Sequence, residues 1–396
     1  MKTSNLAAKM RDKRKQYQIS QHDISALCGI SRVYYSRLES GKDELTLAMY
    51  DFIMERLGRF DPDIPLTMLF DYVRIRFRTD DLEYVIENIL RMKLQYFIHE
   101  DYAFYSYAEH YYLGDIFVMT APGDEKMGVL LELKGRGCRQ FEMYLQAQGR
   151  NWYDFFMACM AEEGTKFKRI DLAINDRTGI LDIPRLADKC KKEECVSLFR
   201  KFNFQGSGAI KRRDEKDGMG NTLYIGSTQS DIFFCVYEKD YEEYAKKGIP
   251  IEDAEVKNRF EIRLKNDRAL HALVDLVSRG NEEETAFDII NRYIRFVDRD
   301  DSRPQDEWET SADWARFIGE GRGKLRLTTE PEPYNVQRTI NWYTHQVVAS
   351  EKMLRIIDGY KGTNIMKDIY DSAVLTDKHK KIIRQHTVTP EEVVDM

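Results

Sequence analysis

Two carboxylates and one tyrosine stand on three segments in which polar and apolar residues alternate. Asp171 lies in "KRIDLAIND", Tyr237 in "FFCVYEKDY" and Glu261 in "NRFEIRLK". Side chains alternate sides along a β-strand, so each of these residues is assigned to a polar face of its strand. If the three polar faces coincide, the two acids form a set of oxygen ligands for a hard divalent cation beside a phenol.

Positively charged residues share those faces. Arg259 and Arg263 alternate with Glu261, and Lys239 alternates with Tyr237. Such cations can pair with carboxylates or contact phosphates. The simpler interpretation is structural, because a strand acid beside arginines is usually one end of a surface ion pair. Likewise, one tyrosine taken from the 23 in the chain is usually structural.

Two alternatives stay open in the same region. Tyr224, in "TLYIGS", is a second candidate nucleophile. If the hairpin turn sets Ile225 opposite Phe233, Tyr224 faces the side opposite Tyr237, and a bulge would undo that inference. Glu238 is a further candidate metal ligand if its strand ends at the preceding residue.

The elements that must position these residues form an α+β pattern of two similar halves. For the first half we expect strands near 72–78, 115–119 and 129–134, and helices over 81–92 and from Arg139 and Trp152. For the second half we expect strands 168–175, 221–226, 232–239 and 259–265, and helices 183–202 and 268–279. Both halves are expected to be antiparallel sheets with helices on one face, followed by a helical C-terminal tail.

The first of these strands carries three arginines on one face. In "YVRIRFRT", Arg74, Arg76 and Arg78 alternate with apolar residues. Three guanidinium groups can hardly be buried unpaired, and they require water, acids or phosphates as partners. We therefore count them among the candidate DNA contacts.

The first sixty residues carry 11 basic against 7 acidic side chains within a protein of net charge -6. The stretch "ISQHDISALCGISRVYYSRLESGK" has the layout of two helices joined by a tight turn, with Ser20 and Ser31 as caps and Gly29 in the turn. It resembles the Cro/repressor-type helix-turn-helix. The expected shared core is Ile24, Leu27, Ile30, Val33 and Leu38.

The resemblance assigns positions relative to duplex DNA. It implies that the recognition helix enters the major groove with Arg32, Tyr34, Tyr35 and Ser36, and that Arg37 and Lys42 lie near phosphates. A small helical domain for protein interaction is the alternative.

The three chemistry-bearing segments, in their order, resemble the catalytic segments of the replication-initiation-factor family. That family includes initiators of rolling-circle plasmids and MobT-type relaxases of conjugative transposons. The likeness runs over about residues 71–300, and with its helix-turn-helix the whole chain is most similar to the transposon relaxases. The family tyrosine falls on Tyr237 and the family acids on Asp171 and Glu261. One departure is Cys235, where plasmid initiators usually have arginine.

The implied reaction is transesterification of single-stranded DNA at an origin, giving a 5'-phosphotyrosyl enzyme and a free 3'-hydroxyl. Tyr237 is the implied nucleophile, with Lys239 and Arg259 as catalytic cations. Asp171 and Glu261 would hold a divalent metal, Mg²⁺ or Mn²⁺. A free tyrosine has a pKa of about 10, so the metal and Lys239 would have to compensate for its weak nucleophilicity at neutral pH.

The remaining sequence limits the classes of function. No apolar run is long enough for a membrane span and no signal peptide precedes the chain, so we expect a cytoplasmic protein without membrane insertion. There is no phosphate loop, no pair of histidines spaced by one residue, and the six cysteines suit reduced thiols.

We expect domains at 1–60, 67–300 and 301–396. Expected partners are duplex origin DNA, the nicked single strand and accessory or coupling proteins of conjugation. The competing functions are a plasmid replication initiator and a non-enzymatic repressor.

Overall fold

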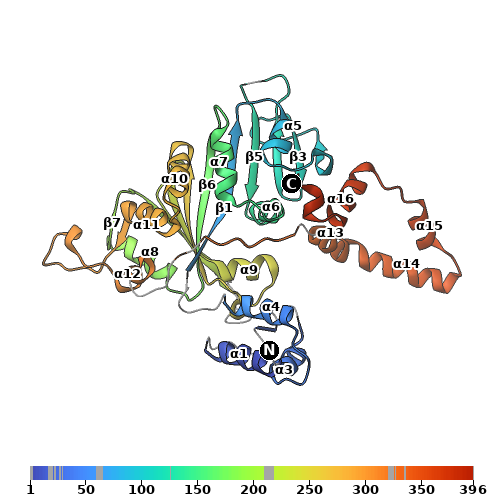
Figure 1. Ribbon diagram of the computed structural model, residues 1–396, viewed down its shortest axis with the longest axis horizontal. Helices are drawn as coiled ribbons and strands as arrows, with labels where there is room; N and C mark the ends of the chain where they lie inside the picture. Colours follow the sequence, from blue (N-terminus) through green and yellow to red (C-terminus); the bar gives the residue numbers. More distant parts are fainter. Residues whose placement is uncertain are drawn as a thin grey trace. The chain divides into compact units, whose positions relative to one another are not determined.

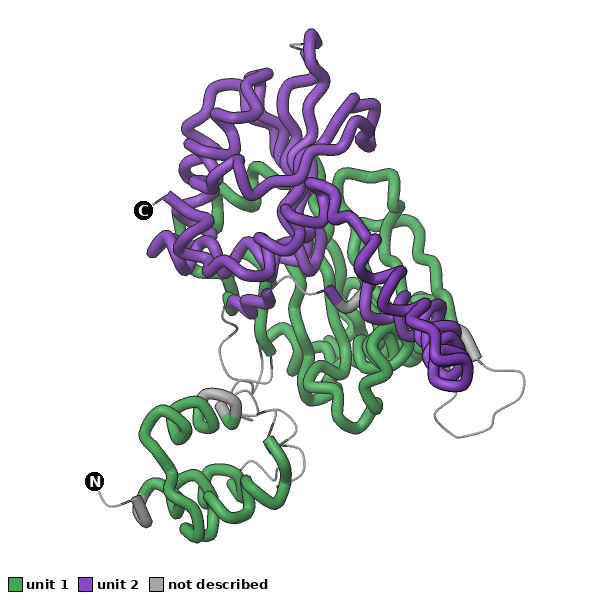
Figure 2. The backbone as a smooth tube through the Cα atoms, turned by 90° about the vertical axis from the view of Figure 1, so that its right-hand side faces the viewer, with its two compact units in different colours: residues 1–69, 171–328 green, residues 70–170, 329–396 purple. Residues whose placement is uncertain are grey.

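The computed structural model describes residues 3–16, 21, 24–25, 28, 30–58, 66–124, 126–208, 218–319, 325, 327–333 and 336–395. It contains two compact units, shown in different colours in Figure 2. Unit 1 comprises residues 1–69 and 171–328, and unit 2 comprises residues 70–170 and 329–396. The domain limits at residues 60, 67 and 300, which we expect from the sequence, stay a prediction.

The helices at the start of the chain that the structure describes include α1 (Thr3–Gln16), α3 (Arg32–Glu39) and α4 (Leu47–Gly58), shown in Figure 1. Helix α3 begins where expected, because the Ser31 hydroxyl accepts a hydrogen bond from the Tyr34 N–H at 3.2 Å. The core of this segment includes Ile24 and Leu38, both fully buried as predicted. Leu27, Ser20 and Gly29 lie outside the described residues.

Two predictions within α3 are wrong. Val33, expected in the core, is 71% exposed, and Tyr35, expected on the DNA-facing surface, is fully buried. Residues three apart share a face of a helix, so Tyr35 lies on the same side as the buried Leu38. The helix therefore turns Tyr35 into the core and Val33 toward solvent.

The strands of unit 1 follow one another in space in the order β6-β11-β10-β9-β8. Their bounds are β6 (Lys166–Asp176, which begins in unit 2), β11 (Asn258–Lys265), β10 (Ile232–Glu238), β9 (Gly218–Ile225) and β8 (Phe202–Gly208). The pairs β8–β9, β9–β10 and β10–β11 are antiparallel. In residues 171–328, unit 1 contains the helices α8 (Ile183–Lys191), α9 (Lys239–Lys247), α10 (Asn266–Arg279), α11 (Glu282–Tyr293) and α12 (Ala312–Ile318).

Unit 2 repeats this arrangement with the strand order β2-β3-β4-β5-β1. The strands are β1 (Leu66–Phe77), β2 (Ile98–Glu100), β3 (Glu109–Leu113), β4 (Ile116–Thr120) and β5 (Val129–Lys134). Helices α6 (Arg136–Ala147) and α7 (Trp152–Ala161) follow β5. Their aromatic side chains close the core, for example Trp152, whose ring centroid lies 5.1 Å from that of Phe70 on β1. The prediction of an α+β fold with two similar antiparallel halves is confirmed.

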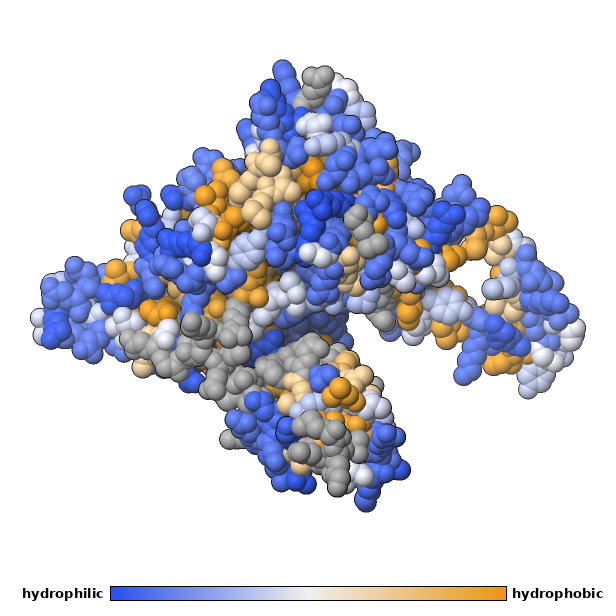
Figure 3. Space-filling view, viewed as in Figure 1, coloured by the Kyte–Doolittle hydropathy of each residue, from blue (hydrophilic) through white to orange (hydrophobic). Residues whose placement is uncertain are grey.

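The C-terminal tail is helical, as predicted. It contains α13 (Gln337–Trp342), η5 (Tyr343–Val347), α14 (Val348–Lys361), α15 (Ile365–Ser372), α16 (Asp377–Thr387) and α17 (Pro390–Val393). Helices α14, α15 and α16 bury none of their side chains fully. Figure 3 shows hydrophobic residues on the surface of this region. Tyr360 on α14 is 91% exposed.

Two expected helices are shorter than predicted. The helix expected over 183–202 ends at Lys191, and residues 195–197 instead form β7 (Cys195–Ser197), which pairs with β12 (Ile294–Phe296). Glu193 has a φ of 60°, which no helix interior allows. The helix expected over 81–92 consists of one short turn, α5 (Leu82–Tyr84), and a π-helical segment, η1 (Val85–Ile89).

Candidate active site

Tyr237 and Glu261 meet on two neighbouring strands of unit 1. The Tyr237 hydroxyl donates a hydrogen bond to Glu261 Oε1 at 2.9 Å. The antiparallel register places Cys235 opposite Glu261, and Tyr237 lies two residues further along β10, on the same face. Tyr237 is 8% exposed and Glu261 3% exposed. The phenol is therefore buried against an acid rather than against apolar side chains.

Arg263 connects the two acids. Its guanidinium contacts Glu261 Oε2 at 2.6 Å and lies 3.7 Å from Asp171 Oδ2. Asp171 is 2% exposed, so both carboxylates are removed from water beside a single cation. Burial by itself would lower the pKa of Arg263, but the negative charges of Glu261 and Asp171 outweigh it and raise that pKa. Arg263 thus stays charged and offsets part of the negative charge of the two acids.

The sequence did not single out this role of Arg263. It indicated only that Arg263 shares the face of Glu261 and could contact a phosphate. The signal that would have identified it is the spacing "E-I-R", because two residues along a strand return a cation to the same face as an acid.

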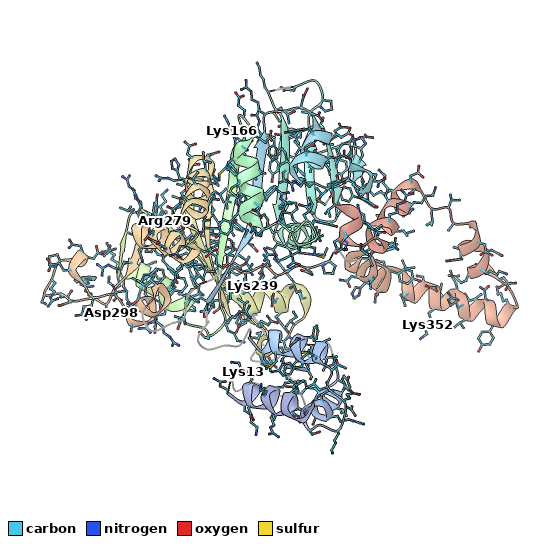
Figure 4. The ribbon with its side chains drawn as sticks, in the orientation of Figure 1. Lys13, Lys166, Lys239, Arg279, Asp298 and Lys352 are labelled. Carbon is cyan, nitrogen blue, oxygen red and sulfur yellow. The ribbon has the colours of Figure 1, made fainter. Side chains whose placement is uncertain are left out.

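Arg259 and Lys239 lie close to Tyr237 but have partners of their own. Arg259 is opposite Tyr237 in the register, and its Nε donates to Asn175 Oδ1 on β6 at 2.8 Å. Lys239 begins α9, where Figure 4 labels it, and its Nζ is hydrogen-bonded to Glu242 and lies 5.8 Å from the centre of the Tyr237 ring. The catalytic roles of Arg259 and Lys239 stay predictions.

The argument that placed Tyr224 on the opposite face is wrong. In the structure Ile225 is opposite Phe234, not Phe233, and Tyr224 is opposite Cys235. This one-residue difference turns Tyr224 to the face that carries Tyr237, because a change of one residue exchanges the two faces of a strand. Burial is the main cause of a raised pKa for Tyr224, and it raises the pKa of Cys235 to about 12.

The structure distinguishes Tyr237 from Tyr224, the second candidate nucleophile, and it also bears on Glu238, the further candidate metal ligand. Tyr237 donates its hydroxyl hydrogen bond to Glu261, whereas Tyr224 is hydrogen-bonded to the Cys235 thiol. Strand β10 ends at Glu238, so the condition for Glu238 as a metal ligand is not met. The Glu238 carboxylate accepts hydrogen bonds from Asn221 on β9 at 2.8 and 2.9 Å.

The donor set fits a hard divalent cation. Asp171 and Glu261 offer carboxylate oxygens on rigid strands, and Mg²⁺ is commonly held by one or two carboxylates together with water and substrate phosphate. Arg263 contacts Glu261 and lies near Asp171, so a metal held by these two acids would compete with the guanidinium for their negative charge. A separate group of three ligand atoms in the described residues, from His99, Asp101 and Glu109, lies in unit 2.

The predicted DNA-binding side chains of α3 are largely on its surface. Arg32, Tyr34, Arg37 and Lys42 are exposed, and Ser36 is half-buried. Arg37 pairs with Asp43 at 2.8 Å, with more than half of its side chain still exposed. The four exposed residues and Ser36 remain candidate DNA contacts, and Tyr35 is removed from the set.

The three arginines of β1 have different surroundings. The Nε of Arg76 donates to the main-chain oxygen of Met127 at 3.0 Å. Arg78 is 69% exposed at its side chain and lies 3.8 Å from Glu163. The guanidinium of Arg74 stacks over the Tyr105 ring, 4.7 Å from its centroid. Their contact with DNA stays a prediction.

An antiparallel sheet preceded in the chain by a helix-turn-helix is the architecture of a DNA-processing class of protein. The chain belongs to the replication initiation factor family. The model of that family matches residues 165–370, the model of the rolling circle replication initiation protein N-terminal domain matches residues 67–158, and a helix-turn-helix model matches residues 10–63. None of the described helices has the length and hydropathy needed to cross a membrane.

Two individual proteins show the same relationship. The chain is 39% identical over 321 residues to the putative DNA relaxase NicK of Bacillus subtilis (strain 168), which corresponds to 81% of this chain and 89% of the relative. It is also similar to the solved structure of a rolling circle replication initiator protein from Geobacillus stearothermophilus, with a TM-score of 0.56 and 26% identity. That likeness covers 64% of this chain and 96% of the other.

Proposed function

We propose that this protein is a relaxase that nicks one DNA strand at the origin of transfer of an integrative conjugative element. The observation that carries the proposal is the hydrogen bond from the Tyr237 hydroxyl to Glu261, next to the pair formed by Asp171 and Arg263. The resemblance of the whole chain, including its helix-turn-helix, to conjugative-transposon relaxases supports the transfer role. Duplex DNA near the origin is bound by the helix-turn-helix, and accessory or coupling proteins receive the nicked strand.

The reaction is a transesterification. The phenolic oxygen of Tyr237 forms a bond to phosphorus while the bond from phosphorus to the 3' oxygen breaks, which leaves a 5'-phosphotyrosyl enzyme and a 3'-hydroxyl. Glu261 accepts the hydrogen bond of the phenol and is positioned to take its proton. The departing 3' oxygen takes up a proton from water. The covalent link keeps the energy of the phosphodiester, so the strand can be resealed without ATP.

A divalent cation supplies the remaining chemistry. Mg²⁺ or Mn²⁺ held by Asp171 and Glu261 would polarise the phosphate and stabilise the charge on the leaving oxygen. Arg169, Arg259 or Arg263 would supply the phosphate contact that plasmid initiators usually make with the arginine at the position of Cys235.

The assay combines the protein with a supercoiled plasmid that carries the origin region and Mg²⁺. We expect relaxed circles and a covalent protein–DNA adduct with the unmodified chain. Tyr237→Phe should bind the plasmid but form no adduct, whereas Tyr224→Phe, its neighbour on the same face, should still form one. An adduct that persists in Tyr237→Phe and disappears in Tyr224→Phe would contradict the assignment of the nucleophile.

A plasmid replication initiator is the second candidate, favoured by the rolling circle initiator among the similar structures. It would use the same chemistry, so the nicking assay does not separate the two. Deletion of the gene does, because loss of a relaxase abolishes conjugation and loss of an initiator abolishes plasmid copying. A non-enzymatic repressor would shift the plasmid without relaxing it.

A further inference from the structure

The segment between β2 and β3, residues 101–107, presents three aromatic rings to solvent. Tyr102 is 58% exposed, Phe104 49% and Tyr105 48%. We call residues 101–107 the aromatic segment. Tyr105 and Ser106 both have positive φ values, 59° and 67°, which residues other than glycine rarely adopt. The surrounding contacts must therefore hold this backbone in place, because an unconstrained chain would leave such a conformation.

Those contacts are made with charged residues of β1 and β5. The Tyr105 hydroxyl donates to Glu132 Oε1 at 2.8 Å, and Arg74 stacks over the Tyr105 ring at 4.7 Å from its centroid. Lys134 pairs with Glu132 at 3.0 Å and lies 5.8 Å from the centre of the Phe104 ring. The rings of Phe104 and Tyr105 thus each have a cation close to them, and about half of each of these side chains is open to solvent.

The same part of unit 2 contains a tyrosine–glutamate pair like that of the active site. The Tyr72 hydroxyl donates to Glu132, which is 1% exposed. The residue opposite Glu132 in the register is Arg74, and Arg169 stacks over the Tyr72 ring at 4.2 Å. A single acid among cations does not provide the paired carboxylates of a metal site, whereas cations next to exposed rings suit a phosphate chain with bases.

The positive charge of this region is dense. The pKa of Lys168 is lowered, first by burial and then by the charges of Lys166, Arg76 and Arg74. Repulsion among these side chains is relieved when an anion approaches them. The acid nearest to the exposed rings in the sequence, Asp101, is 96% exposed at its side chain and lies 3.6 Å from His99, at the beginning of the segment.

We propose that the aromatic segment, with Arg74, Lys134 and Arg169, is a binding site for single-stranded DNA. Bases stack on the exposed rings of Tyr102, Phe104 and Tyr105, and the cations contact the backbone phosphates. Stacking requires base faces that a duplex keeps covered, so the site selects unpaired DNA. This inference rests on the proposed nicking function, which produces and requires a single strand.

The test measures the affinity of the full-length protein for labelled oligothymidine of about 16 nucleotides, a length that fills one single-strand site. Fluorescence anisotropy in EDTA reports binding without cleavage. The variant is the double substitution Tyr102→Ala and Phe104→Ala, two exposed side chains whose removal leaves the Tyr105–Glu132 hydrogen bond intact. We expect its Kd to rise about tenfold or more, since one stacked base contributes about a factor of five to a hundred.

The matched control replaces two other exposed aromatic residues, Tyr360 and Tyr370, by alanine; they are 91% and 82% exposed on α14 and α15. The control should bind like the unmodified chain, and Tyr102→Phe with Phe104→Trp should restore the affinity. An oligothymidine Kd within twofold of the unmodified chain in the alanine variant would overturn the proposal. So would an equal loss of affinity for a duplex of the same length, because stacking on unpaired bases would then not be the cause.

The readout is independent of strand cleavage. If the unmodified chain fails to relax its plasmid while the alanine variant loses oligothymidine affinity, the nicking function is wrong and the binding site stands. If relaxation and adduct formation proceed and oligothymidine affinity does not depend on the aromatic segment, the nicking function stands and the binding site is wrong.

Discussion

Replacing Arg263 by methionine tests the electrostatics of the active site most directly. The guanidinium contacts Glu261 at 2.6 Å and lies 3.7 Å from Asp171, and these two acids are 3% and 2% exposed. Removing one partner of a buried ion pair costs about 3–5 kcal/mol, because a buried charge is left without compensation. The Arg263 side chain is itself 22% exposed, so water can reach the vacated position. We therefore expect the lower end, about 3 kcal/mol.

The assay is thermal unfolding in EDTA. A loss of about 3 kcal/mol corresponds to a fall in Tm of about 6–12 °C for a unit of this size. The control is Arg185→Met, which removes an ion pair with Asp313 whose side chains are 56% and 51% exposed. Such a surface pair contributes less than about 1 kcal/mol, so the control should shift the Tm little.

Added metal should then rescue the variant. Without the guanidinium, Mg²⁺ or Mn²⁺ at the two acids would no longer compete with Arg263, and a metal at a hundred times its Kd stabilises the folded state by about 2.7 kcal/mol. We expect a larger rise of Tm with metal in Arg263→Met than in the unmodified chain. If Arg263→Met were as stable as Arg185→Met in EDTA and metal left its Tm unchanged, the reasoning about the paired acids would be refuted.

Two further predictions concern thiols and a glycine. Iodoacetamide at pH 8 should modify Cys195 before Cys235, as read by peptide mass spectrometry, because a hydrogen bond from Cys190 lowers the pKa of Cys195 while burial raises that of Cys235 to about 12. Since the Cys235 thiol ionises near 9 when unfolded, its contribution to stability should be lost as the pH rises from 9 toward 12. Gly128→Ala should lower the Tm more than Gly149→Ala in calorimetry: both have positive φ, but a Cβ at Gly128 would lie 2.1 Å from a carbonyl oxygen of β1, and one at Gly149 would meet nothing within 4 Å. Equal shifts in the two variants would contradict this.

The sequence predicted the convergence of Asp171, Glu261 and Tyr237 because strand alternation is a local property. Each residue's face follows from its own neighbours, and the family resemblance supplied the order of the three segments along the chain. The position of Tyr224 failed for a different reason. Its face depends on the turn between β9 and β10, where Gly226 adopts a φ of 96°, and a turn conformation that shifts the register by one residue cannot be read from alternation.

Other errors arose where tertiary contacts override local preference. Val33 and Tyr35 are two residues apart on α3 and point to different sides of the helix, so only one of them can face the core, and Tyr35 is the one buried there. Residues 195–197 were assigned to a helix, yet they pair with β12, a partner almost a hundred residues away. The sequence indicated Arg263 only as a possible phosphate contact. Its closeness to Asp171 could not be predicted, because that requires knowing that β6 lies beside β11.

The guanidinium between the two acids also affects how well the strands stay ordered when no metal is bound. Most sites made of clustered carboxylates repel themselves when empty, and the surrounding chain loosens until an ion returns. Here the guanidinium of Arg263 offsets part of the charge of the two acids. The strands can therefore keep their order whether or not a metal is bound. Under the proposed function, Tyr237 would keep its hydrogen bond to Glu261 in a chelating environment, and the arrival of a cation would switch on the chemistry rather than permit folding.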